Sequence, residues 1–264
     1  MDLKLKGKRA FVSGSTQGIG FAIAKQLLRE GAAVTINGRS SERVNEAVNR
    51  LKQEVKDAIV NGIAADFSKK EDIDNLLSQL TETDILINNT GIFEPKAFTD
   101  IPDEDWFRFF EVNVMSGVRL SRQLLPGMLQ RNWGRIIFIS SESAINIPEE
   151  MIHYGMTKTA QLSISRGLAE LTKGTAVTVN AVLPGPTASE GLTTFVGDLA
   201  KAQNITIQQA EKEFFKTTRP TSLLQRFEDV NEIASLVTYI ASPLSSGTNG
   251  ASLRADGGLL KSIY

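Results

Sequence analysis

Tyr154 and Lys158 stand four residues apart in the stretch HYGMTK (153–158). On a helix, this spacing places the two side chains on one face. A phenol beside an ammonium can serve as a general acid and base, because the positive charge stabilises the phenolate. The same spacing occurs on ordinary helix surfaces, so the pair alone does not distinguish a catalytic from a structural role.

Two further polar residues are candidates for the same site. Ser141 ends the apolar segment GRIIFISS (134–141), 13 residues before Tyr154. A strand end, a loop and the first turn of a helix can bring these two hydroxyls together, although Ser141 is otherwise a routine turn residue. Asn113 lies in FFEVNVMSG, inside a helical pattern. Asparagine competes for backbone hydrogen bonds, so Asn113 predicts either a local kink or a buried polar network.

A glycine-rich segment, SGSTQGIG (13–20), follows the first apolar run. Gly14 permits a tight turn, while Gly18 and Gly20 let the backbone approach a phosphate and let the next helix pack closely. The N-terminus of that helix offers free N–H groups and a positive dipole end to a pyrophosphate. The spacing is G-x-x-x-G-x-G rather than G-x-G-x-x-G. Nucleotide binding is the favoured interpretation, and a ligand-free turn is the alternative.

The second expected strand ends in INGRS, with Gly38 and Arg39 where NAD-selective enzymes carry an acid for the ribose 2′-hydroxyl. Arg39 can pair with a 2′-phosphate, which favours NADP(H), with NAD(H) as a possible cofactor. A solvated surface arginine is the alternative, and the glycine-rich segment adds no basic residue of its own. Asp66 could accept a hydrogen bond from the adenine amino group or cap a helix.

The segment NNTG (88–91) closes the fourth expected strand. In open parallel sheets, ligands bind at this edge. Asn88 could brace the neighbouring strand, while Asn89 and Gly91 could lie along the cofactor ribose. Asparagine-rich turns are also common without any ligand.

The elements that must position these residues alternate along the chain. Apolar runs predict strands at 9–14, 32–38, 57–66, 83–91, 134–141, 176–185 and 251–258. Helical patterns fall at 19–31, 41–56, 70–80, 103–130, 152–173, 206–216 and 229–241. This alternation predicts an α/β fold, a Rossmann-like doubly wound parallel sheet of about seven strands with helices on both faces. We expect a single domain over residues 1–264, with an insertion at about 186–228 covering the substrate.

Composition restricts the functional classes. The chain of 264 residues has 29 Lys and Arg against 30 Asp and Glu, a net charge of −1, which argues against a nucleic-acid or membrane-surface role. The absence of cysteine excludes disulfides, thiol catalysis and cysteine-ligated metals, and no metal site is predicted. The first residues do not read as a signal peptide, and no apolar run approaches a membrane span, so a cytoplasmic protein is expected.

These motifs, taken together and in order, resemble the short-chain dehydrogenase/reductase family in its single-domain branch. The resemblance covers essentially the whole chain and includes LPGP (183–186) and DGG (256–258). Ser13 and Thr90 depart from it, standing where the family usually has Thr and Ala. The resemblance implies Asn113, Ser141, Tyr154 and Lys158 as catalytic residues. It implies cofactor contacts at Gly14, Ser15, Gln17, Gly18, Ile19, Arg39, Asp66, Phe67, Asn89, Gly91, Tyr154, Lys158, Pro184, Gly185 and Thr187.

The activity implied by the resemblance is hydride transfer between NADP(H) and a small-molecule carbonyl or alcohol substrate. Tyr154 would be the general acid/base, with its pKa lowered by Lys158 and by the positively charged oxidised nicotinamide, and Ser141 would hold the substrate oxygen. Asn113 would anchor a water linking Lys158 to solvent. The alternatives are a 3-oxoacyl-thioester reductase acting on a carrier protein, an NAD(H)-dependent alcohol or sugar dehydrogenase, and a nucleotide-binding regulator. A homo-oligomer, dimer or tetramer, would form through the helices at 103–130 and 152–173.

The insertion leaves two questions open. Phe195, Phe214 and Phe215 could form an apolar lid or simply pack its helices. The cations Lys201, Lys212, Lys216, Arg219 and Arg226 could attract an anionic substrate, although the neighbouring Glu211 and Glu213 favour a solvated mixed-charge surface. His153, the only histidine, is expected to point away from the catalytic face.

Overall fold

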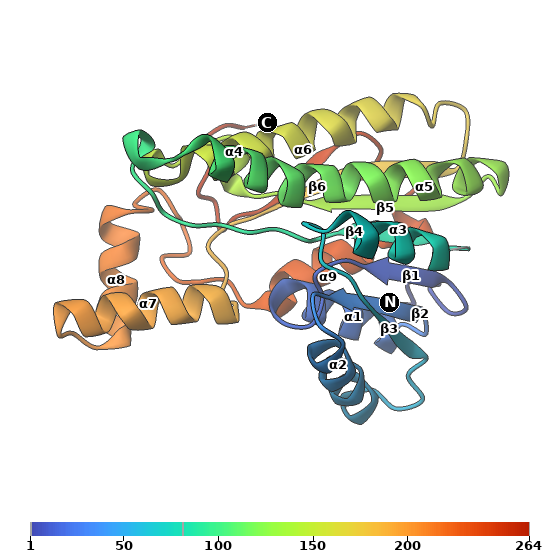
Figure 1. Cartoon of the computed structure of the whole chain (residues 1–264), viewed down its shortest axis with the longest axis horizontal. Helices are drawn as coiled ribbons and strands as arrows, with labels where there is room; N and C mark the ends of the chain where they lie inside the picture. Colours follow the sequence, from blue (N-terminus) through green and yellow to red (C-terminus); the bar gives the residue numbers. More distant parts are fainter. Residues whose placement is uncertain (1, 81, 264) are drawn as a thin grey trace.

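The computed structural model describes residues 2–80 and 82–263, with the side chains of residues 194, 195, 198, 199, 202 and 203 left out. A seven-stranded parallel sheet has the order β3-β2-β1-β4-β5-β6-β7 (Figure 1). The strands are β1 (Arg9–Val12), β2 (Ala33–Gly38), β3 (Val60–Ala64), β4 (Ile85–Asn88), β5 (Gly134–Ile139), β6 (Val177–Pro184) and β7 (Ser252–Ala255). This confirms the predicted fold class.

Helices cover both faces of the sheet, because the strands carry apolar side chains on both faces and these must be buried. They are α1 (Gly18–Arg29), α2 (Ser41–Glu54), α3 (Lys70–Gln79), α4 (Asp103–Phe109), α5 (Ser116–Gln130), α6 (Ile152–Glu170), α7 (Glu190–Gln203), α8 (Ile207–Thr217) and α9 (Val230–Ala241). One core cluster lies between the sheet and α1, α2 and α9, and a second lies under α3, α5 and α6.

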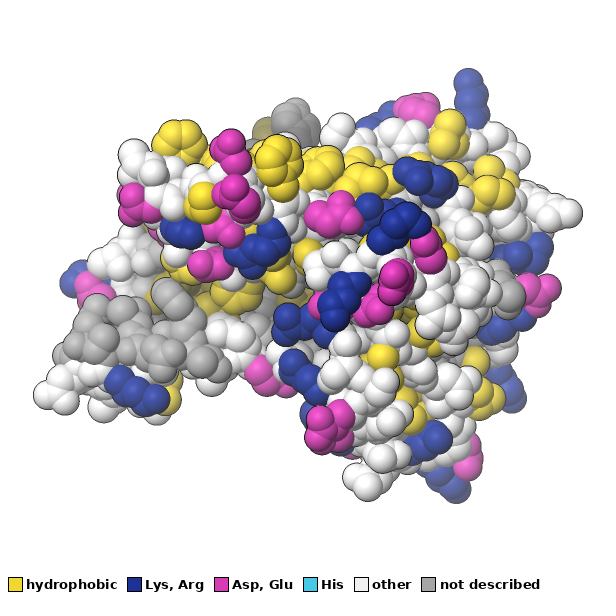
Figure 2. Space-filling view, in the orientation of Figure 1, with side chains coloured by type: hydrophobic (Ala, Val, Ile, Leu, Met, Phe, Trp, Pro, Cys, Tyr) yellow, Lys and Arg dark blue, Asp and Glu magenta, His cyan; other side chains and the backbone are white. Residues whose placement is uncertain are grey.

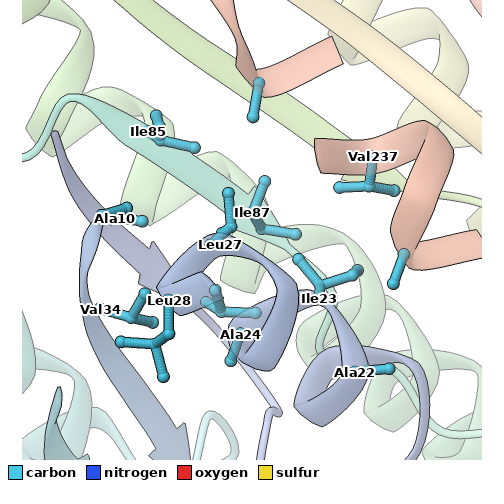
Figure 3. Close-up of a cluster of buried hydrophobic side chains, with 14 of the residues drawn as sticks. Ala10, Ala22, Ile23, Ala24, Leu27, Leu28, Val34, Ile85, Ile87 and Val237 are labelled. Carbon is cyan, nitrogen blue, oxygen red and sulfur yellow. The ribbon is translucent and has the colours of Figure 1, made fainter. Parts of the chain in front are cut away.

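Alternation along the strands divides their side chains between the two clusters. Ile85 and Ile87 of β4 enter the first cluster and Leu86 enters the second. Figure 3 shows α1 directing Ile23 and Leu27 toward the sheet, with Val237 of α9 alongside. A one-residue slip of β4 would reverse all three strand side chains, so the apolar pattern holds the strand in register.

The strand order reverses between β1 and β4, because β2 follows β1 on one side and β4 pairs with it on the other. A crevice forms at such a switch point, outside the carboxyl ends of the strands. The fold therefore brings together the segments that follow β1, β4, β5 and β6.

The long helix predicted at 103–130 is interrupted. Between α4 and α5 lies the π-helical segment η2 (Phe110–Met115), which contains Asn113. Single π-helical turns inside α-helices are frequent at functional sites. The structure thus has both the local irregularity and the buried polar contacts that were posed as alternatives for Asn113.

The insertion contains α7 as well as the predicted α8. The sequence analysis missed α7 because Gly191, Gly197 and two adjacent threonines are poor helix formers. Its usable signal was the spacing of Leu192, Val196 and Ala200, which form a small apolar cluster with Ala210 of α8. In Figure 1, α7 and α8 stand to one side of the sheet. Across the described residues, every helix is too short or too polar to cross a membrane.

Candidate active site

A cavity of about 830 Å³ lies at the carboxyl edge of the sheet, beside α6. Figure 2 shows a hollow between α4 and the α7–α8 pair, with hydrophobic side chains inside it. The cavity brings together the predicted residues Ile19, Asn89, Gly91, Ser141, Tyr154, Lys158, Pro184, Gly185 and Thr187. Outside its lining lie Gly14, Ser15, Gln17, Gly18, Arg39, Asp66, Phe67 and Asn113.

Lys158 is buried one turn along α6 from Tyr154. Its Nζ lies 5.6 Å from the centroid of the Tyr154 ring. It donates hydrogen bonds to the Ile139 carbonyl oxygen at 3.0 Å and to Gln161 Oε1 at 3.4 Å. Burial disfavours the charged ammonium and lowers the pKa of Lys158 to about 8. Lys158 therefore remains mainly a cation at pH 7 and loses its charge under mildly alkaline conditions.

The Tyr154 phenol is harder to ionise than a free tyrosine. Burial raises its pKa to about 12, which outweighs the lowering effect of the Ser141 hydroxyl. The charge of Glu142 raises this pKa further, and that of Arg219 opposes it. In the chain by itself desolvation dominates, so the pKa of Tyr154 lies above its usual value. The lowering expected from Lys158 together with the oxidised nicotinamide concerns the cofactor-bound site and stays a prediction.

Ser141 is positioned by the turn that follows β5. It is buried, and its Oγ accepts a hydrogen bond from the Ser143 N–H at 3.1 Å, which caps the short helix η3 (Glu142–Ala144). The Ser141 O–H remains able to donate, because a hydroxyl accepts and donates at once. The Ser141 hydroxyl is therefore a hydrogen-bond donor beside Tyr154 in the cavity at the carboxyl edge of the sheet.

Asn113 lies outside the cavity lining and links the segment after β4 to α6. Its Oδ1 accepts from the Ile92 N–H at 2.7 Å, while its Nδ2 donates to the Ile92 carbonyl oxygen at 2.9 Å and to Thr157 Oγ1 at 3.0 Å. Its own carbonyl oxygen accepts from Gln161 Nε2 at 2.6 Å. Gln161 thus joins Lys158 to the Asn113 backbone through one amide.

Gln161 was missed in the sequence, although it stands three residues after Lys158 and so shares its helix face. It is 2% exposed, and its amide oxygen and nitrogen both have partners. A buried amide with both ends bound holds a fixed orientation. Gln161 therefore fixes the distance between α6 and the π-helical turn.

The glycine-rich segment forms the turn between β1 and α1. Gly14 and Gly18 have φ values of +59° and +60°, which favour glycine. A Cβ on Gly20 would lie 2.5 Å from Asn89 Nδ2 and 2.6 Å from the Gly14 carbonyl oxygen. The N-cap Gln17 makes no side-chain cap hydrogen bond, so the first N–H groups of α1 lack this partner. The turn offers these donors to an anion.

Two asparagines brace this turn. Asn89 donates from Nδ2 to the carbonyl oxygens of Ser13 and Gly14, at 3.1 and 2.8 Å. Asn37, which the sequence analysis missed, accepts the Gly14 N–H and donates to the Ile63 carbonyl oxygen. Asn89 therefore does the bracing that was expected of Asn88.

Asn88 and Ser15 have different partners from those expected. Asn88 Nδ2 donates to Ser121 Oγ on α5. The hydroxyl of Ser15 donates to the Val12 carbonyl oxygen and accepts the Asn37 N–H, so the side chain of Ser15 holds strands together. Asn88 therefore links β4 to α5, and Ser15 links the turn after β1 to β2.

Basic residues gather where β2 meets α2. Arg39 is exposed at the end of β2, and its charge acts on Asp66. Arg43, one turn into α2, donates to Gln17 Oε1 in the glycine-rich turn. Its N–H also bonds Ser40 Oγ, the N-cap of α2. The sequence analysis missed Arg43, whose signal was its place four residues after Arg39 at the start of a helix.

Asp66 and Phe67 follow β3 at the same edge. Burial raises the pKa of Asp66, but hydrogen bonds from Ser68 and the charge of Arg39 outweigh it, and the net pKa is lowered. Asp66 Oδ1 accepts both the N–H and the hydroxyl of Ser68, so it stabilises its own turn. The Phe67 side chain is buried in the second core cluster.

The turn after β6 closes the other side of the cavity. The Gly185 N–H lies 2.8 Å from the Ala255 carbonyl oxygen and 3.0 Å from Glu228 Oε2. Thr187 Oγ1 donates to the Gly185 carbonyl oxygen at 2.9 Å. Burial raises the pKa of Glu228 to about 7. Pro184 ends β6, and the hydrogen bonds of Gly185 and Thr187 hold the backbone that follows it.

The aromatic residues of the insertion pack mainly on each other. Phe214 and Phe215 are buried, and both rings stack on Phe227 at centroid distances of 5.2 and 5.0 Å. Phe214 also lines the cavity. Phe195 lies outside the residues whose side chains are described. For the described pair, helix packing is the main role, and Phe214 contributes to the wall as well.

Arg219 is not a free cation. It is 7% exposed, and its Nε donates to Glu142 Oε1 at 3.0 Å. Arg226 pairs with Glu232, and Lys216 lies near Glu213. The expected solvated mixed-charge surface is thus supported for Lys216 and Arg226, whereas Arg219 departs from it because its guanidinium is buried at the cavity. The partnership of Arg219 with Glu142 was missed, because the two residues are 77 positions apart.

His153 packs away from the cavity, as expected. It is buried, with its ring centroid 4.0 Å from that of Phe109 and 5.9 Å from that of Trp106. Neither ring nitrogen has a hydrogen-bonding partner among the described residues. Burial lowers the pKa of His153, so the ring is neutral at pH 7.

The groups at this edge fit a nicotinamide dinucleotide. Glycines line the approach to the N-terminus of α1, where a Cβ on Gly14 would lie 3.1 Å from Thr90 Oγ1. That hydroxyl is buried without a partner among the described residues, so it can bond to a ligand in the crevice. A pyrophosphate suits the helix N-terminus, and the Lys158 ammonium suits ribose hydroxyls.

Known proteins share this architecture. The sequence profile described as short chain dehydrogenase matches residues 8–199. The chain is 54% identical to YvaG, an uncharacterised oxidoreductase of Bacillus subtilis, over 100% of both chains. It is 30% identical to the 3-oxoacyl-[acyl-carrier-protein] reductase FabG of Aquifex aeolicus, over 98% of this chain and 100% of that one. The structure of L-sorbose reductase from Gluconobacter frateurii, complexed with NADPH and L-sorbose, is similar with a TM-score of 0.93, 29% identity and full coverage of both chains.

Proposed function

Because the chain belongs to the short chain dehydrogenase family, whose members are oxidoreductases acting on alcohol and carbonyl groups, we propose that it transfers a hydride between NADP(H) and a carbonyl or alcohol substrate, with Tyr154 as general acid/base. The observation that carries this proposal is the convergence of Ser141, Tyr154 and Lys158 on one cavity. Each has the chemistry that carbonyl reduction requires from the protein.

Tyr154 supplies the proton in reduction and removes it in oxidation. Its raised pKa keeps the hydroxyl protonated at neutral pH, ready to donate to a carbonyl oxygen that gains charge. Ser141 donates a second hydrogen bond to the same oxygen. The nicotinamide, when bound, supplies or accepts the hydride.

Lys158 stabilises the phenolate that remains after Tyr154 has given up its proton. With a pKa of about 8, Lys158 is protonated roughly ten times more often than neutral at pH 7. Its Nζ also faces Gly91, where an added Cβ would lie 3.4 Å away, so a ribose hydroxyl can approach it closely there. The Lys158 ammonium thus binds the cofactor ribose and stabilises the Tyr154 phenolate.

The preference for NADP(H) rests on Arg39 and Arg43. Both lie where β2 meets α2, and Arg43 contacts Gln17 of the glycine-rich turn. A guanidinium pairs strongly with a 2′-phosphate, and the Ser40 hydroxyl beside Arg43 can add a donor. The NADPH complex of the similar L-sorbose reductase supports this choice.

A fluorescence titration with NADPH and NADH tests the cofactor proposal. We expect Arg39→Ala and Arg43→Ala each to weaken NADPH binding about tenfold or more, the effect of a charged hydrogen bond, and to leave NADH binding unchanged. Lys52→Ala, in the last turn of α2, is the matched control and should change neither. Equal NADPH affinity in all variants would refute the 2′-phosphate site. Tighter NADH binding by the unmodified protein would favour an NAD(H)-dependent alcohol or sugar dehydrogenase.

Reduction of a carrier-bound 3-oxoacyl thioester is the second candidate, supported by the similarity to FabG. It uses the same catalytic residues and differs in the rim of the cavity. That rim presents Glu149, Glu150 and Glu213, which would repel an acidic carrier. Activity on an acyl thioester above that on free ketones would favour this candidate.

Oligomerisation remains part of the proposal. Phe107 and Phe110 are 72% and 40% exposed on the segment 103–130, where a dimer or tetramer contact was expected. Exposed aromatic side chains close together are typical of contact surfaces. Light scattering after size exclusion should give a mass of two or four chains, and Phe107→Glu should reduce it. A monomer in the unmodified protein would refute the contact.

A further inference from the structure

Carboxylates dominate the substrate end of the cavity. Glu142, Glu149, Glu150 and Glu213 line it, and Arg219 is the guanidinium that faces them among the described lining residues. Arg219 is already paired, with its Nε 3.0 Å from Glu142 Oε1 and its Nη1 3.5 Å from Glu150 Oε1. The other cation of the lining, Lys158, is assigned above to Tyr154 and the cofactor, so the substrate end of the cavity disfavours carboxylate and phosphate substrates.

Glu142 has one carboxylate oxygen committed and one free. Its Oε1 accepts from Arg219 Nε and from Ser143 Oγ, the latter at 3.1 Å. Its Oε2 is buried without a partner among the described residues, although the side chain lines the cavity and the residue is only 3% exposed. An unpaired buried carboxylate oxygen is costly, so this atom calls for a hydrogen-bond donor from outside the chain.

Glu142 lies close to the reacting group. It follows Ser141 directly and lines the same cavity as Ser141 and Tyr154. Arg219 holds the other carboxylate oxygen, Oε1, and their buried ion pair fixes the orientation of the carboxylate. A donor bound at Glu142 would therefore belong to a substrate atom near the carbonyl that Tyr154 and Ser141 hold.

We propose that Glu142 Oε2 binds a hydroxyl group next to the reacting carbon, so that the substrates are neutral hydroxylated carbonyl compounds such as hydroxyketones and ketoses, or the corresponding polyols. Glu142 is then a substrate-binding residue and Arg219 is a positioning residue. A hydroxyl suits this site because it donates to a carboxylate and also accepts from a carboxylic acid.

This inference rests on the proposed carbonyl reduction, and the test separates the two. Two isosteric substrate pairs are compared: 1-hydroxy-2-propanone with 2-butanone, and 1,3-dihydroxyacetone with 3-pentanone. For each, kcat/KM is measured at saturating NADPH in the unmodified protein, in Glu142→Gln and in Glu211→Gln. Glu211 is the matched control, because this half-buried carboxylate accepts a backbone N–H from Phe227 and lies outside the cavity lining.

We expect the unmodified protein to prefer the hydroxylated member of each pair at least tenfold. Glu142→Gln should lower kcat/KM for the hydroxylated ketones about tenfold to a hundredfold, the effect of losing a charged hydrogen bond. Because the Glu142 charge also acts on Tyr154, a change in the acidity of Tyr154 affects both members of a pair alike. The ratio of kcat/KM for the hydroxylated ketone to that for the plain ketone should therefore fall at least tenfold. Glu211→Gln should change neither. If Glu142→Gln does not fold, Glu142→Asp, which withdraws the carboxylate by one methylene, should show the same selective loss.

Three results overturn the inference, and they differ in what they leave standing. An equal loss on both members of a pair would mean that Glu142 only positions Ser141 and Tyr154, while carbonyl reduction itself stands. A protein that binds NADPH but neither reduces any of the four ketones nor oxidises glycerol with NADP⁺ would refute the proposed function, and this inference with it. Equal activity on hydroxylated and plain ketones in the unmodified protein would refute the inference alone.

Discussion

Replacing Gln161 should move the pH dependence of catalysis in opposite directions for two substitutions. Lys158 Nζ donates to Gln161 Oε1, and a hydrogen bond to the charged form raises the pKa of an amine. Gln161→Leu removes this acceptor and should lower the Lys158 pKa. Gln161→Glu puts a carboxylate in the same place and should raise it.

The size of the shift follows from the geometry. At 3.4 Å the Lys158–Gln161 bond is long, so it contributes less than a charged hydrogen bond of ordinary length, about 1 kcal/mol. One pKa unit equals about 1.4 kcal/mol, so the expected decrease is ~0.7 units. Starting from a pKa of about 8, the leucine variant should titrate near ~7.3.

The assay is kcat/KM for ketone reduction at saturating NADPH between pH 6 and 10. Activity should fall as the pH rises through the Lys158 pKa, because the ammonium that supports Tyr154 is lost. Tyr154, with a pKa of about 12, does not titrate in this range. The alkaline limb should therefore lie lower in Gln161→Leu and higher in Gln161→Glu than in the unmodified protein.

Ser165→Ala is the matched control. Ser165 is buried one turn further along the same face of α6, and its Oγ has no partner among the described residues. Its removal should leave the alkaline limb in place. If both Gln161 variants keep the limb of the unmodified protein, Gln161 does not act on Lys158 and the reasoning is refuted.

Three further predictions concern the turn, the ion pair and the histidine. Gly20→Ala should weaken NADPH binding more than tenfold in a fluorescence titration, because its Cβ would lie 2.5 Å from an amide nitrogen, whereas Gly197→Ala, with nothing within 4 Å, should not. In urea denaturation, Arg219→Met should lower the free energy of unfolding by about 3 kcal/mol, because it leaves Glu142 buried and unpaired, and adding Glu142→Leu should recover most of it. Since the pKa of His153 is lowered, its neutral form stabilises the fold above pH ~6.5, and this contribution is lost as the pH falls through the lowered value. His153→Phe should therefore lose less thermal stability than the unmodified protein between pH 7.5 and pH 5.

Each of these has a contrary outcome. Unchanged NADPH binding by the alanine variant of Gly20 would mean that the turn can shift to accept the added Cβ without losing its affinity for the cofactor. A double variant at Arg219 and Glu142 no more stable than the single one would show that the ion pair is not the source of the loss. Identical acid sensitivity with and without His153 would assign the effect to other groups.

The elements of the sheet were predictable because their signals are local. A strand buried on both faces needs a continuous apolar run, as in β4, and a helix on the sheet needs the 3.6-residue period seen in α1. Helix α7 was missed for the converse reason: its local sequence is a poor helix former, and packing on α8 stabilises it.

The placement of two motifs was equally predictable, since Tyr154 and Lys158 share a helix face by spacing alone, and the glycines before α1 require a tight turn. The amino-acid sequence by itself therefore determined the α/β sheet, the residue types at its carboxyl edge and the glycine-rich turn. It could not determine the contacts that tune these groups, because they join segments far apart in the chain. Only the tertiary structure decided that Gln161 reaches the Asn113 backbone, that Arg219 pairs with Glu142, and that burial raises the Tyr154 pKa. Desolvation and long-range hydrogen bonding depend on what surrounds a side chain, and the surroundings exist only after the chain has folded.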